Sequence, residues 1–260
     1  RQWILHVLVS LFCITGRSER PSSHYARVLA TEGTDGIRYA VDEAEAERCP
    51  EEESLRTVLR SLGIAESDLQ GSLRNFPGVE WELGGDSCAV KEIQFPGRRD
   101  LGGSLHPRIA ELTALEYLDL RDTNVSGSLD VLANNTKLRN LQLRHTRVTG
   151  RLEDLPKAKR LDSLDLTGTE VTGDLAALAN ATELEYLRLA NTAVSGELKS
   201  LEKLTELKQL DLSGELKSVE KLTELEKLEL SNTDVSGELK SLAKLKRLEK
   251  LELANLEVVG

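Results

Sequence analysis

The stretch LTALEYLDLRDTNVSG at residues 112–127 decides the fold, because its skeleton returns along the chain. Successive copies keep a spacing close to L-x-x-L-x-x-L-x-L and end on a glycine, at positions 103, 127, 150, 173, 196, 214, 237 and 260. The steps from one of these glycines to the next are 24, 23, 23, 23, 18, 23 and 23. A fixed period in the twenties predicts a solenoid, in which stacked units share one continuous core.

Two apolar rhythms follow each other inside one unit. Leu112, Leu115 and Leu118 are spaced by three positions, and Leu118 and Leu120 by two. The period of two is typical of a short strand with its leucines on one side. An amphipathic helix needs alternating steps of three and four, so a coiled coil in the Lys/Glu-rich stretch 198–212 is disfavoured. We expect parallel strands at 117–121, 140–144, 163–167, 186–190, 209–213, 227–231 and 250–254, with a leading strand at 92–96.

The loop after most strands reads Thr-x-Val-Ser/Thr-Gly, as in residues 146–150 and 169–173. The valine is predicted to return to the core, and the glycine to adopt a turn conformation that other residues reach at a higher cost. The threonine hydroxyls at positions 123, 146, 169, 192 and 233 are predicted to form a ladder that satisfies buried loop amides.

These units resemble the plant-type class of leucine-rich repeats, found in receptor-like kinase ectodomains and secreted inhibitor proteins. That class usually reads L-x-x-L-x-x-L-x-L-x-x-N-x-L-x-G-x-I-P. Here a threonine replaces the asparagine, and Gly-x-Leu replaces Gly-x-Ile-Pro, as in Gly127-Ser128-Leu129. The resemblance covers roughly residues 90–260 and implies an α/β leucine-rich repeat solenoid with a curved parallel β-sheet on its concave face. It leaves the partner open, because one fold hosts many functions.

The N-terminal segment 1–48 differs in character from the repeats. Residues 1–16 hold the apolar run WILHVLVSLFCI, which is too short to span a membrane and is typical of a secretory signal peptide. The alternatives are a buried helix and a truncated anchor. Residues 17–48 are expected to form a poorly ordered leader. The chain has no methionine and ends within a repeat, without a polar cap after Leu256, so we expect a fragment truncated at the C-terminus.

Residues 49–89 are expected to cap the solenoid at 90–260. Pro50, three acidic residues in the first turn and Gly63 after the last turn predict a helix at 50–62. Cys49 precedes this helix and Cys88 precedes the first strand, which predicts a disulfide that ties the helix to the first repeat. The alternative is two free buried thiols in a cytosolic protein. Trp81 and Cys88 are similar to the cap of plant-type repeats, although the two-cysteine string of that cap is absent.

A ligand is expected on the concave face, where the outward strand residues of the early repeats vary and include the Tyr and Arg types that anchor interfaces. The alternative is that these side chains only keep the face soluble. In the late repeats Lys227 and Glu229 stand beside Lys250 and Glu252, a pattern predicted to be mildly self-repelling. The predicted ligand-contacting residues are Tyr117, Asp119, Arg121, Asn140, Gln142, Arg144, Asp165, Tyr186 and Arg188.

The short step of 18 removes five positions, including the inward valine, between two nearly identical segments. We therefore predict a local irregularity at 212–220, with extra turn or helix on the convex side. Three sequons are candidates for N-glycosylation, at Asn124, Asn134 and Asn180. Such triplets also arise by chance in repeats rich in Asn and Thr.

Enzyme function is not expected from these residues. No P-loop, G-x-G-x-x-G, H-E-x-x-H, G-x-S-x-G or zinc-type cysteine spacing occurs, so we expect no catalytic residue, cofactor or metal ligand. The net charge of −10 argues against a nucleic-acid partner held by phosphate contacts. The sequence thus predicts a secreted or extracellular module that binds a protein or peptide and contains no membrane span. The alternatives are an intracellular scaffold or regulatory repeat protein, and the regulatory ectodomain of a receptor-like kinase whose catalytic part is missing.

Overall fold

The computed structural model describes residues 29–31, 38–40, 49–84, 87–155, 160–196, 198–212, 222–230, 242 and 244–252. The chain divides into two units, Arg1–Arg48 and Cys49–Gly260. In the first unit β1 (Leu29–Thr31) pairs antiparallel with β2 (Arg38–Ala40), within the stretch expected to be a poorly ordered leader. The run predicted to be a signal peptide lies outside the described residues, and so does the C-terminal end at 253–260.

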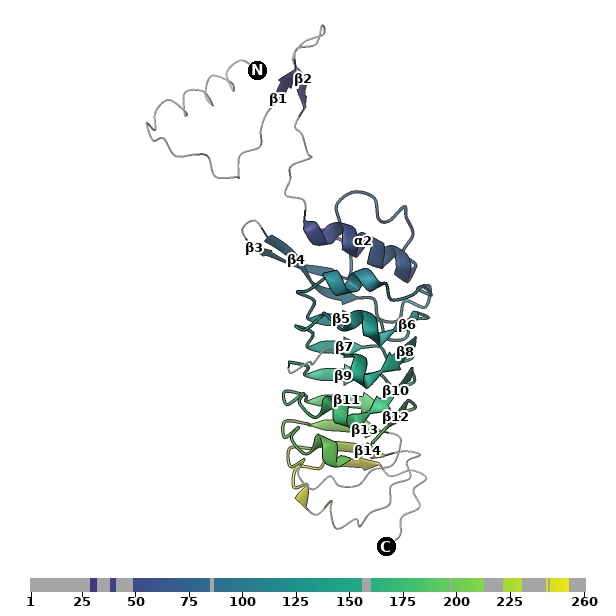
Figure 1. Ribbon diagram of the computed structural model, residues 1–260, viewed down its shortest axis with the longest axis vertical. Coiled ribbons are helices and arrows are strands. Elements are labelled where there is room, and N and C mark those ends of the chain that lie inside the picture. Colours follow the sequence, from purple (N-terminus) through teal and green to yellow (C-terminus); the bar gives the residue numbers. More distant parts are fainter. Residues whose placement is uncertain are drawn as a thin grey trace, which may run out of the picture. The chain divides into compact units, whose positions relative to one another are not determined.

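The second unit is a stack of strands that form one long sheet (Figure 1). In the described part of the chain the order is β15-β14-β13-β11-β9-β7-β5-β4-β3, parallel except for the antiparallel pair β3 and β4. Each predicted repeat strand is present and begins where expected, and the first four end earlier than predicted, whereas the leading strand begins earlier than predicted. The strands are β3 (Val79–Gly84), β4 (Ser87–Gln94), β5 (Tyr117–Asp119), β7 (Asn140–Gln142), β9 (Ser163–Asp165), β11 (Tyr186–Leu189), β13 (Gln209–Leu212), β14 (Lys227–Leu230) and β15 (Lys250–Glu252).

The repeat strands end early because local hydrogen bonds turn the chain. The Asp119 Oδ1 atom accepts a bond of 3.2 Å from the backbone N–H of Arg121, and Asp165 Oδ1 accepts one of 3.0 Å from that of Thr167. A short carboxylate that bonds to the backbone two residues ahead is typical of a turn. The next residue in several repeats then adopts the left-handed conformation, with φ of 57° at Asp122.

The core is a set of leucine columns that run along the stack. Leu118, Leu141 and Leu164 pair in register across β5, β7 and β9, and the column continues through Leu187 and Leu210. All five side chains are 0% exposed. Burial of one leucine contributes about 1.5–3 kcal/mol, so the columns supply much of the stability.

A second, narrower sheet lies beside the first and was not predicted. Its order is β12-β10-β8-β6, and short 3₁₀ helices follow its strands. The inward valines of these strands are buried as expected. Gly127 has φ of 111°, and a Cβ there would lie 2.9 Å from the Leu105 nitrogen, so the repeat glycine is required. The elements are β6 (Ser126–Ser128), β8 (Arg147–Arg151), β10 (Glu170–Asp174), β12 (Ala193–Ser195), η2 (Pro107–Glu111), η3 (Leu129–Leu132), η4 (Leu152–Asp154), η5 (Leu175–Leu178) and η6 (Leu198–Leu201).

The predicted threonine ladder is confirmed in part, and its hydroxyls also have a second partner that was not predicted. Thr123 Oγ1 donates to the Leu120 carbonyl at 2.7 Å within its own repeat, and the bond recurs at positions 146, 169 and 192. As predicted, loop amides also donate to these hydroxyls: the backbone N–H of Val125 to Thr123 Oγ1 and that of Val194 to Thr192 Oγ1, both at 3.4 Å. A bridge between repeats comes instead from Asn135, whose Nδ2 donates to the carbonyls of Ile109 and Leu112 at 3.0 and 2.9 Å. Thr233 lies outside the described residues.

The cap consists of α2 (Pro50–Leu62), which covers the first end of the core. Its bounds are those that the sequence predicts, and it ends at Gly63 in the left-handed conformation. The apolar face of α2, which includes Leu55 and Leu59, is fully buried. Cys49 and Cys88 form a disulfide, as the sequence predicts. The Glu51 carboxylate also accepts a 2.6 Å hydrogen bond from the backbone N–H of Val90.

The short step of the repeat leaves the main sheet in register. Gln209 on β13 pairs with Lys227 on β14, and the two strands stay parallel through Leu212 and Leu230. The predicted irregularity at 212–220 falls almost wholly outside the described residues, so it remains a prediction.

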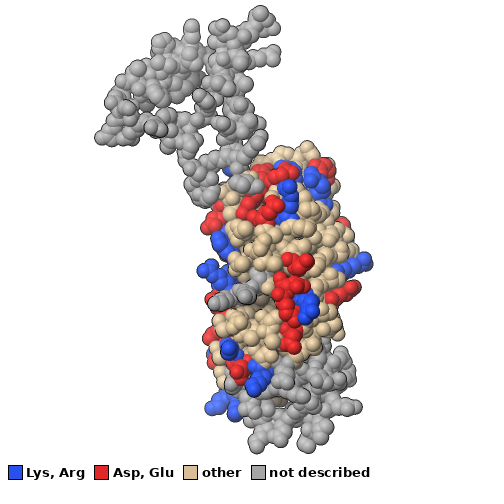
Figure 2. All heavy atoms as spheres, viewed as in Figure 1, with Lys and Arg blue, Asp and Glu red and all other residues tan. Residues whose placement is uncertain are grey.

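Figure 2 shows the charges on one face of the molecule. On this face a column of Asp and Glu side chains lies among scattered Lys and Arg side chains.

Candidate functional site: a groove on the concave sheet

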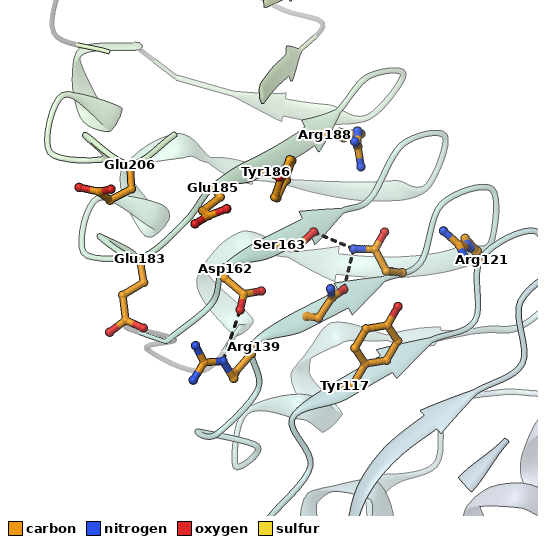
Figure 3. Close-up of a pocket in the computed structure, with 12 residues that line it drawn as sticks. Tyr117, Arg121, Arg139, Asp162, Ser163, Glu183, Glu185, Tyr186, Arg188 and Glu206 are labelled. Atoms are coloured by element: carbon orange, nitrogen blue, oxygen red, sulfur yellow. Dashed lines mark hydrogen bonds and ion pairs between the residues drawn. The ribbon is translucent and has the colours of Figure 1, made fainter. Parts of the chain in front are cut away.

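A groove of about 700 Å³ lies on the concave face of the main sheet, over β5, β7, β9 and β11 (Figure 3). Its lining includes two tyrosines that lie three strands apart, Tyr117 on β5 and Tyr186 on β11. Both occupy the first position of their strands, and three strand spacings of about 4.8 Å place their backbones about 14 Å apart. Tyr186 is 36% exposed, and the Arg188 guanidinium lies 5.9 Å from its ring centre.

The floor of the groove is polar and tightly connected. Gln142 Nε2 donates to Asn140 Oδ1 at 2.7 Å and to Ser163 Oγ at 2.9 Å. Gln142 is only 5% exposed and Ser163 only 7%. In the described part of the chain, nothing donates to Gln142 Oε1 and nothing accepts the Ser163 hydroxyl proton. The floor therefore offers one unused acceptor and one unused donor.

One edge of the groove is formed by the residues that directly precede the strands in sequence, and this edge is mostly acidic (Figure 3). Two of its carboxylates are neutralised: Asp162 lies 3.3 Å from Arg139 Nε, and Glu185 lies 2.6 Å from Lys208 Nζ. Two further carboxylates on this edge, those of Glu183 and Glu206, have no ion pair within the described ranges. The residues of this edge that line the groove are Arg139, Asp162, Glu183, Glu185 and Glu206.

The opposite edge, after the strands, carries arginines. Arg121 Nε lies 3.3 Å from Asp119 Oδ2. Arg188 Nη2 donates to Gln209 Oε1 at 2.6 Å, and its Nη1 lies 3.7 Å from Asp165 Oδ2. A smaller hollow of about 450 Å³ adjoins this edge; its lining includes Arg121, Arg144, His145, Asp165, Thr167 and Arg188.

Asp122 organises the turn beside the smaller hollow. Its carboxylate accepts a bond from Arg144 Nη2 at 3.1 Å and contacts His145 Nδ1 at 3.0 Å. Burial raises the pKa of Asp122, but these two bonds outweigh burial and bring the pKa below its ordinary value. Arg144 is thus held by a charged partner and is less available to a ligand.

The structure divides the predicted ligand-contacting residues into three groups. The first group lines the main groove, and Arg144 and Asp165 line the smaller hollow. Asp119 is fully buried and lines neither, because Arg121 covers it and its carboxylate bonds to the turn backbone. Burial raises the pKa of Asp119. The groove-lining residues among those predicted are Tyr117, Arg121, Asn140, Gln142, Tyr186 and Arg188.

The Lys/Glu columns of the late repeats do not repel as the sequence predicts. Lys227 and Lys250 do pair in register on β14 and β15. However, Glu229 lies 2.7 Å from Lys227 Nζ on its own strand and 3.0 Å from Lys250 Nζ diagonally across on β15, so each lysine has a carboxylate partner. Lys250 also contacts Glu252 at 2.6 Å. This part of the face is neutralised by its own ion pairs.

Asp211 on β13 has a strongly perturbed carboxyl group. Burial, Glu229 and Asp165 raise its pKa to about 6, although Lys227 and Arg188 oppose the shift. The native pKa lies above the value of about 3.9 expected in the unfolded chain. The charged form therefore costs stability at neutral pH, and this cost disappears as the pH falls through about 6 toward 4.

Asp211→Asn is accordingly expected to stabilise the protein at pH 7.5 by about 2 kcal/mol, after allowance for solvent screening, and to leave its stability unchanged near pH 4. Urea unfolding at the two pH values measures the difference. Glu206→Gln, an exposed change on the same face, serves as the control and is expected to shift neither value. Equal gains at both pH values would show that charge on Asp211 is not the cause.

The three sequons differ in their surroundings. Asn124, Asn134 and Asn180 are all exposed. Asn124 Nδ2 donates to the Arg99 carbonyl at 2.7 Å, whereas Asn134 and Asn180 occupy the same position of two repeats. Glycosylation at these positions remains a prediction.

Within the described ranges, no helix is long and apolar enough to cross a membrane. No cluster of three or more His, Cys, Asp or Glu side chains in that part of the chain is arranged to hold a metal ion.

Comparisons with known proteins place the fold. No protein-family model matches the chain, and no curated protein matches it. The solved structure of PEPR1-AtPEP1 is 27% identical over 79% of this chain and 31% of that chain, with a TM-score of 0.67. The Arabidopsis receptor kinase HAESA ectodomain, in complex with an IDA peptide hormone ligand, is 22% identical over 79% of this chain and 41% of that one, with a TM-score of 0.58. A plant ice-binding protein is 18% identical over 81% of both chains, with a TM-score of 0.58.

The chain spans about a third of the PEPR1 chain and less than half of the HAESA chain. The likeness to HAESA and to the ice-binding protein concerns the fold alone, because sequence identity to both is low. Repeat period, stacked parallel strands and structural neighbours agree: this is a leucine-rich repeat protein that resembles the ectodomains of plant receptor kinases.

Proposed function

We propose that this chain is a non-catalytic, extracellular recognition module that binds a peptide or a peptide segment of a protein in the groove between Tyr117 and Tyr186. The groove itself is the observation that carries the proposal. It combines two aromatic walls, a polar floor and charged edges on one rigid sheet. Tyrosine and arginine in such a setting are the residue types that dominate binding energy at interfaces.

Two observations support the extracellular and peptide-binding parts of the proposal. The Cys49–Cys88 disulfide favours an oxidising compartment and weighs against the intracellular scaffold, because cytosolic thiols are kept reduced. The HAESA structure holds a peptide hormone on a related fold.

The double change Tyr117→Ala/Tyr186→Ala is expected to weaken binding about 30-fold or more. Loss of one interface anchor typically costs about 2 kcal/mol or more, and each 1.4 kcal/mol is a factor of about ten in affinity. The probe is a set of synthetic dodecapeptides chosen from a random displayed library by selection on the full wild-type chain. Calorimetry then measures Kd for the wild-type and variant chains.

Lys250→Ala is the matched control, since Lys250 lies on the same sheet outside the groove. It is expected to leave Kd unchanged. Wild-type affinity in the double tyrosine variant, with the fold intact by circular dichroism, would place peptide binding elsewhere and contradict the proposal.

A further inference from the structure

We propose that the bound peptide crosses the groove diagonally, with a lysine or arginine between Glu183 and Glu206 and a carboxylate on Arg121. This inference rests on the proposed function, because it specifies the chemistry of the peptide that the same groove would hold. It follows from which charges the fold leaves without partners and from the hydrogen-bonding groups between them.

The acidic corner is formed by Glu183 and Glu206. They stand three positions before Tyr186 and Gln209, which pair in register on β11 and β13. Neighbouring parallel strands are about 4.8 Å apart, so the two carboxylates come from adjacent turns of the stack. Both residues are exposed, and neither has an ion pair in the described part of the chain. Two carboxylates without cationic partners at one corner attract a cationic side chain of a ligand.

The other charges of this edge are already engaged. Arg139 holds Asp162, and Lys208 holds Glu185. The equivalent position in the next repeat after Glu206 is Glu224, whose carboxylate forms an ion pair with Arg247. The free negative charge of this edge is therefore concentrated at the corner near Tyr186.

The basic corner is Arg121, diagonally opposite beside Tyr117 (Figure 3). Its side chain is 45% exposed and contacts Asp119 through Nε. Neither of its two terminal nitrogens donates a hydrogen bond to a described residue. A guanidinium with both terminal nitrogens free presents the fork that binds a carboxylate through two parallel bonds. By contrast, Arg188 is engaged by Gln209 and Asp165.

The floor between the corners suits a peptide backbone. Gln142 Oε1 is an unused acceptor and the Ser163 hydroxyl an unused donor, and both side chains are more than nine-tenths buried. A peptide group offers one N–H and one C=O, which matches one acceptor and one donor. This match favours an extended peptide over a ligand that carries charge alone.

The geometry also sets the length of the peptide. The corners are separated by about three to four strand spacings along the stack and by the equivalent of about five extended residues along the strands, or roughly 23 Å. An extended chain covers about 3.3 Å per residue, so the charged residues of the ligand should lie about seven positions apart. The two ends of the ligand thus carry opposite charges at a defined spacing.

Selection of random dodecapeptides from a displayed library tests the inference, with the full chain as the target. On the wild type we expect enrichment of sequences that carry a Lys or Arg and an Asp or Glu six to eight positions apart. On Arg121→Glu the acidic residue should be replaced by a basic one. On Glu183→Lys/Glu206→Lys the basic residue should be replaced by an acidic one.

Matched control variants are Arg147→Glu on β8 and Glu170→Lys on β10, two exposed charges on the second sheet. They should select the wild-type sequences. If a reversed-charge variant does not fold by circular dichroism, Arg121→Gln and Glu183→Gln/Glu206→Gln replace it. Each should weaken the wild-type peptide about five- to tenfold, the scale of one partly exposed charged contact.

The possible failures are distinguishable. The selected peptides could depend on Tyr117 and Tyr186 for binding but carry no pair of opposite charges, or the charge-reversed chains could select the same peptides as the wild type. Either result would overturn this inference and leave the proposed function intact. Peptides whose affinity ignores the tyrosines would overturn both.

Discussion

Gly103→Ala is expected to destabilise the folded protein by about 3 kcal/mol or more, because it forces an atom into the backbone of the cap helix. A Cβ at position 103 would lie 1.8 Å from the Ser61 carbonyl oxygen and 2.8 Å from the Leu62 carbonyl carbon. The backbone N–H of Ser104 also donates to that Ser61 oxygen at 2.8 Å. Backbone atoms in a helix cannot rotate away, so α2 must lift from the first repeat.

Urea unfolding followed by far-ultraviolet circular dichroism measures this loss. Gly102→Ala, one position earlier, is the matched control, because the nearest atom to its Cβ would be Asn124 Cβ at an ordinary 3.7 Å. The control should shift the free energy of unfolding by less than about 0.5 kcal/mol. Equal unfolding midpoints for the two variants would mean that α2 does not dock on Gly103 as described.

The repeat strands were predictable because burial imposes their pattern. Leu118 and Leu120 differ by two positions, and both are fully buried. A shift of one residue would move every leucine of a strand to the exposed face, so the register is strongly determined. The cap helix was equally predictable from the sequence, because Pro50 at its start and Gly63 after its end are strong local signals of helix boundaries.

The second sheet and the shape of the face were harder to predict. In β8 and β10 the burial pattern has a single inward valine, so each strand carries too little apolar periodicity to be recognised. Asp119 points outward by strand alternation, yet it is fully buried because it bonds to the turn and Arg121 covers it. The alternation of side chains along a strand predicts which face of the sheet a residue lies on, but not how deeply its side chain is buried.

The acidic edge of the groove was missed for a related reason. Glu183 and Glu206 lie in loops before the strands, where neither a period of two nor a helical period applies. They occupy equivalent positions of consecutive repeats, and only the stacking of those repeats makes them neighbours. An alignment of the repeats would have revealed this edge, because it places Glu183 and Glu206 in one column, three positions before each strand.

Loss of the Cys49–Cys88 disulfide is expected to lower the free energy of unfolding by about 4 kcal/mol. The chain-entropy model gives roughly this value for a loop that closes 39 residues. The loop includes all of α2, and the bond between Glu51 and the Val90 backbone lies next to its closure. Urea unfolding of Cys49→Ala/Cys88→Ala, and of the wild type with and without a reductant, measures the effect.

The reductant should leave the double alanine variant unchanged, which separates the disulfide from other effects of the reagent. Hydrogen exchange should show the largest loss of protection in α2, because the disulfide joins the start of that helix to β4. The fold brings Cys49 and Cys88 together in any compartment, so only the redox environment decides whether they form a disulfide. Free thiols in the native protein would therefore contradict both the disulfide pairing and the proposed extracellular location.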